Sequence, residues 1–231
     1  MKLGVVIFPG SNCDQDLIEV LKQHCTTNVV ELWHKDTDLQ GSTHVFIPGG
    51  FSYGDYLRSG AIAKLSPIMA AVKEHAARGG FVMGICNGFQ ILCEAGLLEG
   101  ALLRNENQLF VCQNVFLTPH NCHTSVTHAL DVDKAYKIPI AHAEGRFYAD
   151  AETISRLEYN DQIIFRYSSE DGETSPAFNP NGSVNNIAGI CNAEQNVFGM
   201  MPHPERAASA DLFNTDGLLI FKHLLSPVVS A

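Results

Sequence analysis

The sequence predicts an α/β fold: an open, mostly parallel sheet with helices on both faces, plus a smaller antiparallel strand region. In the first part of the chain, short apolar runs alternate with amphipathic segments, which is the pattern of βαβ units. These runs are apolar throughout, as strands covered on both faces require. Further along, the runs become longer and partly alternate apolar with polar residues, which is typical of antiparallel strands.

Local signals place the elements of the first part. Pro9-Gly10 ends the first apolar run, and Ser66-Pro67 is typical of a helix N-cap followed by proline at the first helical position. Gly79-Gly80 is a helix stop. The expected elements are a strand at 3–8, a helix at 14–24, strands at 28–33 and 44–51, a helix from 66 to about 78, and a strand at 81–85.

The second part is expected to contain more strands and two helices. An acidic segment from Asp150 to about Asn160 predicts one helix, and the amphipathic segment 215–225 predicts another. The remaining expected elements are strands at 108–118, 136–142 and 162–168, and a hairpin of 187–192 with 196–205. No repeat and no linker rich in proline, glycine or serine interrupts the chain, so we expect residues 1–231 to form one domain.

Composition excludes several classes of protein. The chain has 231 residues, is 45% hydrophobic and carries a formal net charge of −10, the opposite of the balance that nucleic-acid binding needs. The N-terminal apolar run is too short for a signal peptide, and no run is long enough to span a membrane. The seven cysteines are odd in number and irregularly spaced, which argues against a disulfide framework and favours a reduced, cytoplasmic location.

One group of histidines and cysteines raises the question of a metal. Cys112, His120, Cys122 and His123 lie close in sequence, but no C-x-x-C occurs and their spacing is not that of a zinc site. We therefore expect a polar surface loop at this point and no metal centre in the chain.

The sequence Gly84-Ile85-Cys86-Asn87-Gly88 joins a predicted strand to a predicted helix. Gly-x-Cys-x-Gly in this position has the layout of a nucleophile elbow, a sharp turn whose flanking residues must lack bulk. The N-terminus of the following helix would face the Cys86 thiol, and its dipole and free N–H groups favour the thiolate. A buried structural cysteine in a tight loop is the alternative interpretation.

A thiolate nucleophile needs a base, and the base needs an orienting group. The segment MPHPE, residues 201–205, supplies His203 and Glu205. Prolines on both sides of His203 predict an extended segment, in which residues two apart face the same side. Glu205 would then accept a hydrogen bond from one ring nitrogen of His203 while the other nitrogen faces the thiol. The alternative is a loop histidine near a surface salt bridge.

The two glycines Gly49-Gly50 end another predicted strand. Open α/β sheets bind ligands at the carboxyl ends of their strands, and glycines leave their backbone N–H groups unobstructed. One of these N–H groups, together with the N–H of Asn87, predicts an oxyanion hole for acyl transfer to Cys86. A plain Gly-Gly turn is the alternative.

Seven longer stretches carry a family resemblance. They are FPGSNCDQD, PGGFSYGDYLRSGAIA, GICNGFQIL, NENQLFVC, IPIAHAEGRF, NPNGSVNNIAGICN and MMPHPERA. With the cysteine elbow, they resemble a class I glutamine amidotransferase of flavodoxin-like fold. More narrowly, they resemble the glutaminase subunit (subunit I) of phosphoribosylformylglycinamidine synthase, of de novo purine biosynthesis. The resemblance covers nearly the whole chain.

The resemblance implies a reaction and a role for each residue of the triad. Cys86 would attack the side-chain amide of glutamine and form a glutamyl thioester. His203 would take the thiol proton and later give a proton to the leaving ammonia, while Glu205 would orient His203.

Further contacts and partners are also implied. Gly50 and Asn87 would donate to the oxyanion, and Gln90, one turn into the elbow helix, would hold the α-amino or carboxylate group of glutamine. The sequence contains no phosphate-binding loop, so we expect no cofactor in this chain. ATP and Mg would bind a separate large synthetase subunit that converts formylglycinamide ribonucleotide to formylglycinamidine ribonucleotide, and a small subunit would bridge the two chains.

Two alternatives of a different kind remain open from the sequence. The first alternative is that the chain is the glutaminase subunit of another amidotransferase complex. The second is that it is an α/β protein of the peptidase type with a cysteine elbow. The H-P-E pair argues against the second alternative, and the complete triad argues against a non-catalytic regulatory subunit.

Overall fold

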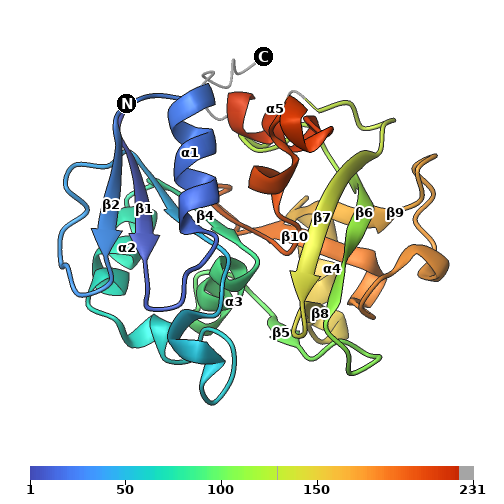
Figure 1. The fold of residues 1–231 in the computed structure, drawn as a ribbon. Helices are drawn as coiled ribbons and strands as arrows, with labels where there is room; N and C mark the ends of the chain where they lie inside the picture. The colour runs from blue at the N-terminus through green and yellow to red at the C-terminus, as the bar shows by residue number, and fades with distance from the viewer. Residues whose placement is uncertain (129, 224–231) are drawn as a thin grey trace.

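The computed structural model describes residues 1–128 and 130–223, and the backbone has the predicted α/β pattern (Figure 1). The helices and strands, in chain order, are β1 (Leu3–Ile7), α1 (Asp14–His24), β2 (Val29–Trp33), β3 (His44–Ile47), α2 (Ile68–Ala77), β4 (Phe81–Ile85), α3 (Asn87–Glu94), β5 (Ala101–Leu103), β6 (Val111–Pro119), β7 (Tyr136–His142), β8 (Arg146–Tyr148), α4 (Ala151–Tyr159), β9 (Ile163–Ser168), β10 (Ile187–Cys191), β11 (Val197–Met200) and α5 (Asp216–His223). None of the helices in these ranges has the length and apolar character that crossing a membrane requires.

Within the described residues, the main sheet has nine strands in the order β2-β1-β3-β4-β11-β10-β9-β6-β7, and β5 pairs separately with β8. Neighbours from β2 to β11 are parallel, whereas those from β11 to β7 are antiparallel. The predicted parallel sheet and its antiparallel region are therefore confirmed, and so is the pairing of β10 with β11. Most of the antiparallel strands extend the same sheet rather than forming a separate layer.

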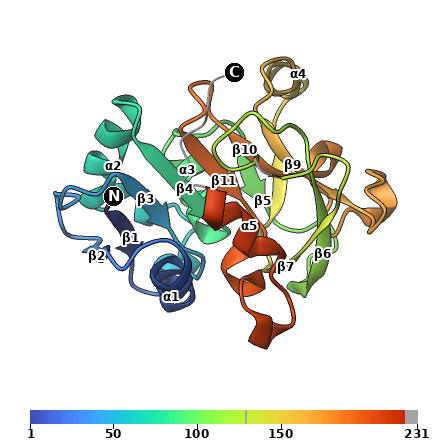
Figure 2. The same ribbon diagram turned by 90° about the horizontal axis from the view of Figure 1, so that it is seen from above.

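Helices cover both faces of the parallel strands. Figure 2 shows α1 and α5 on one side, with α2 and α3 on the other. The predicted apolar face of α1 is buried, and Val5, Val45 and Val82 at the centre of the parallel strands are fully buried. Burial on both faces explains why these strands read as continuous apolar runs.

The topology places four chain segments at one edge of the sheet. Because β1, β3, β4 and β11 are parallel, the residues after Ile7, Ile47, Ile85 and Met200 all emerge at the same edge. A backbone hydrogen bond of 2.7 Å from the Cys86 N–H to the Met200 carbonyl ties two of these segments together. The predicted nucleophile, oxyanion turn and base all lie in these segments.

Several local predictions differ from the structure. The hydroxyl of Ser66 lies 2.9 Å from the Tyr53 hydroxyl and makes no cap bond to α2, so its expected role as an N-cap is wrong. β11 ends at Met200, five residues before the predicted end of that strand. The predicted C-terminal helix is present up to His223, and its expected last two residues lie outside the described ranges.

Candidate active site

Cys86 lies at a strained corner between β4 and α3. Its backbone has φ 50° and ψ −105°, a region that residues other than glycine rarely occupy. A Cβ on Gly84 would lie 2.6 Å from the backbone of Gly88, and a Cβ on Gly88 would overlap the Ile47 carbonyl of β3. The two glycines are therefore required because helix and strand pack backbone to backbone, as the elbow motif predicts.

His203 and Glu205 form a buried pair. His203 Nδ1 lies 2.6 Å from Glu205 Oε1, and both side chains are only 1% exposed. The structure brings them together, but the predicted extended backbone is wrong: Pro204–Ala207 is a 3-10 turn that begins after His203. Proline favours the first position of a helical turn because its fixed φ suits the turn and its missing N–H is not needed there.

The surroundings of His203 favour its protonated form. Burial alone would lower the pKa of His203, but the Glu205 carboxylate and the negative charge of Cys86 as thiolate, with hydrogen bonding from Cys13 and Cys86, outweigh burial and hold the pKa well above its ordinary value. Nε2 of His203 is buried and has no hydrogen-bond partner among the described residues. Cys13 and Cys86 both lie near enough to the ring to raise its pKa, and Nε2 remains available for proton transfer.

A second thiol borders the imidazole. A Cβ on Gly49 would lie 2.6 Å from His203 Cε1 and 3.3 Å from Cys13 Sγ, so glycine at this position leaves room for both side chains. Donor atoms of Cys13, His203 and Glu205 lie within 4.8 Å of one another, close enough for a metal. The guanidinium Nη2 of Arg206 lies 3.1 Å from Cys13 Sγ, and this positive charge disfavours a metal cation there. Cysteine and histidine residues at 112–123 form no such cluster in the described structure.

The predicted oxyanion donors lie at the same edge. The backbone N–H groups of Gly50 and Asn87 have no acceptor among the described residues, and Gly50 lines one cavity with Cys86. The Gly49 carbonyl accepts a hydrogen bond of 3.4 Å from the Cys13 N–H. Because the peptide bond between Gly49 and Gly50 is trans, the Gly50 N–H points the opposite way, away from Cys13. Gly50 has φ 139°, and a Cβ there would lie 2.6 Å from the Gly10 carbonyl oxygen. Glycine at position 50 therefore lets the two loops meet.

The cavity beside Cys86 is small, about 60 Å³. The Cys86 sulfur lies 3.8 Å from the Ala141 carbonyl oxygen at the end of β7. The residues that line the cavity are Gly50, Phe51, Asp55, Ser59, Cys86, Gln90, Ala141, His142, Ala143 and Glu144. Its wall thus combines the elbow, the loop after β3 and the segment after β7.

Gln90 holds this wall together. Its Nε2 donates to the Glu144 carbonyl at 2.5 Å, and its Oε1 accepts from Asn87 Nδ2 at 2.9 Å. Asn87 Oδ1 in turn accepts from the Ser52 N–H at 3.1 Å. These bonds use one of the two N–H donors of the Gln90 amide and one lone pair of its oxygen, so the predicted contact with glutamine would have to come from the second N–H or the second lone pair.

The loop after β3 carries backbone strain and a perturbed carboxyl group. Tyr53, Asp55 and Leu57 have φ values of 55°, 52° and 72°. The Tyr53 hydroxyl, 2.6 Å from His34 Nδ1, anchors the loop. Burial raises the pKa of Asp55 to about 6, and the charge of Glu144 adds to this effect. Strain of this kind concentrates at functional sites and switch regions.

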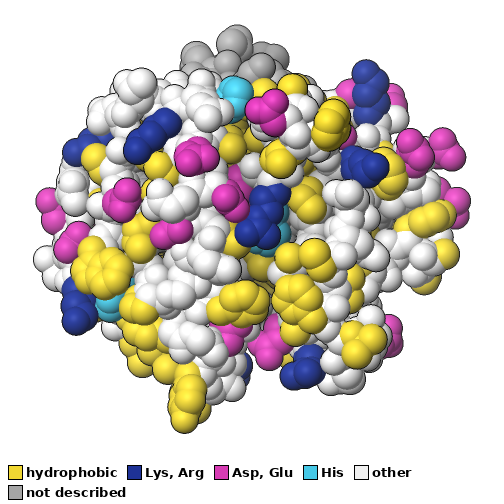
Figure 3. All heavy atoms as spheres, in the orientation of Figure 1, with side chains coloured by type: hydrophobic (Ala, Val, Ile, Leu, Met, Phe, Trp, Pro, Cys, Tyr) yellow, Lys and Arg dark blue, Asp and Glu magenta, His cyan; other side chains and the backbone are white. Residues whose placement is uncertain are grey.

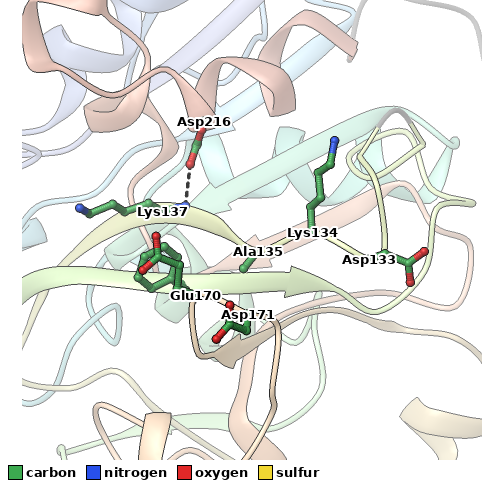
Figure 4. A pocket seen from close by; sticks show the side chains of 8 residues that line it. Asp133, Lys134, Ala135, Lys137, Glu170, Asp171 and Asp216 are labelled. Atoms are coloured by element: carbon green, nitrogen blue, oxygen red, sulfur yellow. Dashed lines mark hydrogen bonds between the residues drawn. The ribbon is translucent and has the colours of Figure 1, made fainter.

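A much larger cavity lies elsewhere and has a different character. It has a volume of about 580 Å³ and is lined by Phe116, Asp133, Lys134, Ala135, Lys137, Glu170, Asp171 and Asp216. Figure 4 shows its charged side chains, with Asp216 accepting from the Lys137 backbone N–H. No nucleophile with a neighbouring base lines it, so we place the candidate active site at the smaller cavity.

Several residues of the site are not evident from the sequence. Cys13 has the pattern of a core cysteine, whereas His142 and Asp55 stand in segments 142–146 and 52–55, which the family resemblance places near the mouth of the site or at the docking face without giving either residue a role in the reaction. One signal is available for Cys13, which follows a Pro-Gly turn at the end of the first parallel strand. The carboxyl ends of parallel strands are where such sites form.

Comparison with known proteins adds family evidence to this geometry. A family model described as the CobB/CobQ-like glutamine amidotransferase domain matches residues 1–215. The chain is 56% identical to phosphoribosylformylglycinamidine synthase subunit PurQ of Moorella thermoacetica, over 99% of this chain and 95% of that protein. It is 53% identical to subunit PurQ of Nostoc sp. (strain PCC 7120), over 100% of this chain and 99% of that protein.

Solved structures give the same picture. A chain in the structure of PurLQS from Thermotoga maritima matches with a TM-score of 0.85 and 39% identity, covering 97% of each chain. A glutamine amidotransferase from the same organism shares the fold, with a TM-score of 0.62 at 13% identity, covering 100% of this chain and 99% of that chain.

Proposed function

Because the chain belongs to the glutamine amidotransferases, and among them to the PurQ subunits of phosphoribosylformylglycinamidine synthase, we propose that its Cys86 site hydrolyses glutamine for that enzyme. The observation that carries the proposal is the buried pair of His203 and Glu205, 2.6 Å apart, beside a cysteine on a strained elbow. A nucleophile, a base and an orienting group in this order are the requirements of acyl transfer.

Each residue has a role in the proposed reaction. The Cys86 thiolate attacks the side-chain carbonyl carbon of glutamine, and the N–H groups of Gly50 and Asn87 stabilise the oxyanion. The intermediate collapses to a glutamyl thioester when the C–N bond breaks and His203 gives its proton to the leaving nitrogen. His203 then activates water, which releases glutamate, and Glu205 keeps the imidazole oriented throughout.

The ammonia is consumed by another chain. A large synthetase subunit binds ATP and Mg and converts formylglycinamide ribonucleotide to formylglycinamidine ribonucleotide, and a small subunit bridges the two. The related Thermotoga maritima structure is named PurLQS, and the three letters L, Q and S in this name agree in number with the three subunits of this arrangement. The present chain supplies one amidotransferase domain, residues 1–231. It needs no cofactor of its own, and it acts in the cytoplasm.

Docking of the synthetase controls the site through the loop after β3. The cavity beside Cys86 is only about 60 Å³ and the strained loop forms part of its wall, so movement of this loop would widen the site for glutamine. Phe51 lies on that wall and stacks on Phe110, with ring centroids 6.4 Å apart. Tyr56 and Leu57 of the strained loop are 73% and 84% exposed.

The apolar side chains at this mouth form a surface for a partner. Figure 3 shows apolar side chains gathered over the lower middle of the face in view, the region of the loop after β3 and the segment between β5 and β6. Exposed apolar residues in these segments include Phe51, Tyr56, Leu57, Leu109 and Phe110, and Leu103 at the end of β5 is exposed beside them. Exposed apolar patches of this kind mark interaction sites.

Reconstitution with the synthetase subunits tests the proposed function. We expect glutamine-dependent formation of formylglycinamidine ribonucleotide by the complex, and glutamine hydrolysis by the isolated chain that is about 10²–10³ times slower because the wall of the site is closed, a factor comparable to the loss of one oxyanion donor. Steady-state glutaminase rates with and without the partners measure this. Full activity of the isolated chain would exclude control by docking. A complex that uses added ammonia but never glutamine would exclude the function itself.

A further inference from the structure

His142, the last residue of β7, lies beside the nucleophile without a role in the triad. Its side chain is 3% exposed, and the residue lines the cavity next to Cys86. The preceding residue, Ala141, places its carbonyl oxygen 3.8 Å from the Cys86 sulfur. A Cβ on Gly145 would overlap the His142 ring, so the ring packs against the bare backbone of that glycine.

The hydrogen bonds of Asn105 determine the tautomer of His142. Asn105 Nδ2 donates to the carbonyl oxygens of Leu109 at 2.9 Å and His142 at 2.8 Å, while Oδ1 accepts from the Gly145 N–H at 3.1 Å. These three bonds fix which end of the amide is oxygen. His142 Nδ1 lies 3.1 Å from this oxygen and must donate to it. The neutral ring therefore carries its proton on Nδ1 and has a free lone pair on Nε2.

The lone pair of Nε2 is buried and unused. His142 Nε2 has no hydrogen-bond partner among the described residues. Burial, together with the nearby charge of His203, lowers the pKa of His142 to about 4, so the ring is neutral at physiological pH. A buried acceptor without a partner costs free energy, and native proteins rarely leave one unless a ligand or water completes it.

We propose that His142 Nε2 accepts a hydrogen bond from the nitrogen of the substrate's side-chain amide, and then from the ammonia formed from it. The proposal rests on the proposed glutaminase function. When the C–N bond breaks, the electron pair goes to nitrogen, the proton comes from His203, and one N–H of the leaving group points to His142. No proton moves to His142.

A neutral acceptor suits a product that must react later. Ammonia is a nucleophile only while it keeps its lone pair, and a group that readily gave it a proton would trap it as ammonium. His142 orients the leaving nitrogen so that its lone pair faces His203, and it holds the ammonia without changing its charge. His142 is thus a further catalytic residue, separate in function from the base.

Two substitutions separate this role from a structural one. His142→Asn keeps an N–H donor for Asn105 and removes the acceptor at Nε2, whereas His142→Gln places an amide oxygen near the Nε2 position. Both variants, in the reconstituted complex, are compared with the native chain on glutamine and on the γ-methyl ester of glutamate. The ester passes through the same thioester, but its leaving oxygen has no N–H to donate.

The expected result is a change in substrate ratio. His142→Asn lowers kcat/KM for glutamine about 10-fold, the size of one hydrogen bond made in the transition state, and changes ester hydrolysis less than about two-fold. His142→Gln restores part of the loss. An equal fall for both substrates, or no fall for glutamine, overturns the proposal. If the native complex splits the ester but not glutamine, the proposed function fails instead.

The tautomer is measurable without any substitution. Nitrogen-15 NMR of the histidine-labelled native chain should show His142 protonated at Nδ1 and bare at Nε2 at neutral pH. The opposite tautomer, or a doubly protonated ring, contradicts the proposal even if the variants fail to fold.

Discussion

Cys86→Ala is expected to abolish glutamine-dependent synthesis by the reconstituted complex and to leave synthesis from added ammonia intact. Cys86 only makes ammonia, whereas the synthetase partner consumes it, so the two activities separate at this residue. Loss of the nucleophile of a comparable triad costs on the order of 10⁶ in kcat. Parallel assays with glutamine and with ammonium salt as nitrogen donor measure both activities on one preparation.

Cys112→Ala is the matched control. Cys112 is exposed on β6 and lies outside the lining of the candidate site, so its replacement should leave both activities unchanged. An unfolding midpoint close to that of the native chain establishes that Cys86→Ala is folded, since removing one sulfur at a cavity wall costs little stability. If the folded variant lost both activities alike, the division of labour between the chains would be wrong.

The second large effect is expected at the base. His203→Ala should lower glutamine hydrolysis on the order of 10⁶-fold and Glu205→Ala on the order of 10⁴-fold, because the orienting residue acts only through the base. Glu205→Gln is the companion variant, since it fills the same buried space and keeps an oxygen near His203 Nδ1. Steady-state kcat and KM for glutamine are measured in the complex.

The relative size of the losses caused by His203→Ala and Glu205→Ala tests the roles assigned to the two residues. A Glu205 variant that is more damaging than His203→Ala would give Glu205 a structural or substrate-binding role instead of an orienting one. Ammonia-dependent synthesis again serves as the internal control, because neither residue takes part in it.

Local patterns in the sequence predicted the elements and the elbow well. Apolar runs, the glycines around Cys86 and the stop at Gly79-Gly80 act within a few residues, so they can be read without a fold. The same is true of the pairing of β10 with β11, which are joined by a short turn. His203 and Glu205 could be proposed as the other members of the triad because the elbow predicts a nucleophile, and a nucleophile needs the base and the orienting group that H-P-E supplies.

Contacts between distant segments could not be predicted in this way. Cys13 reaches His203 only because Gly49 has no side chain, and a Cβ on Gly50 would lie 2.6 Å from the carbonyl oxygen of Gly10. The lone pair of His142 is free because Asn105, 37 residues earlier, takes its other nitrogen. Each of these facts depends on the packing of several elements at one sheet edge.

The geometry of the H-P-E segment is a more instructive error. The flanking prolines suggested an extended chain, but Pro204 begins a 3-10 turn and brings Glu205 back toward the His203 ring. Proline excludes few conformations for the residues after it, so the extended backbone was one of two outcomes that its presence allowed. The contact between the side chains was predicted, whereas the backbone path that makes it was not.

The most direct test of the proposed mechanism, in which glutamine forms a thioester with Cys86, is the mass of the Cys86 peptide during turnover. The reconstituted complex is mixed with glutamine, quenched in acid within one turnover and digested, and each cysteine peptide is weighed. The account predicts a glutamyl adduct on Cys86, absent when glutamine is omitted. An adduct on another cysteine, or turnover without any adduct on the chain, would contradict it.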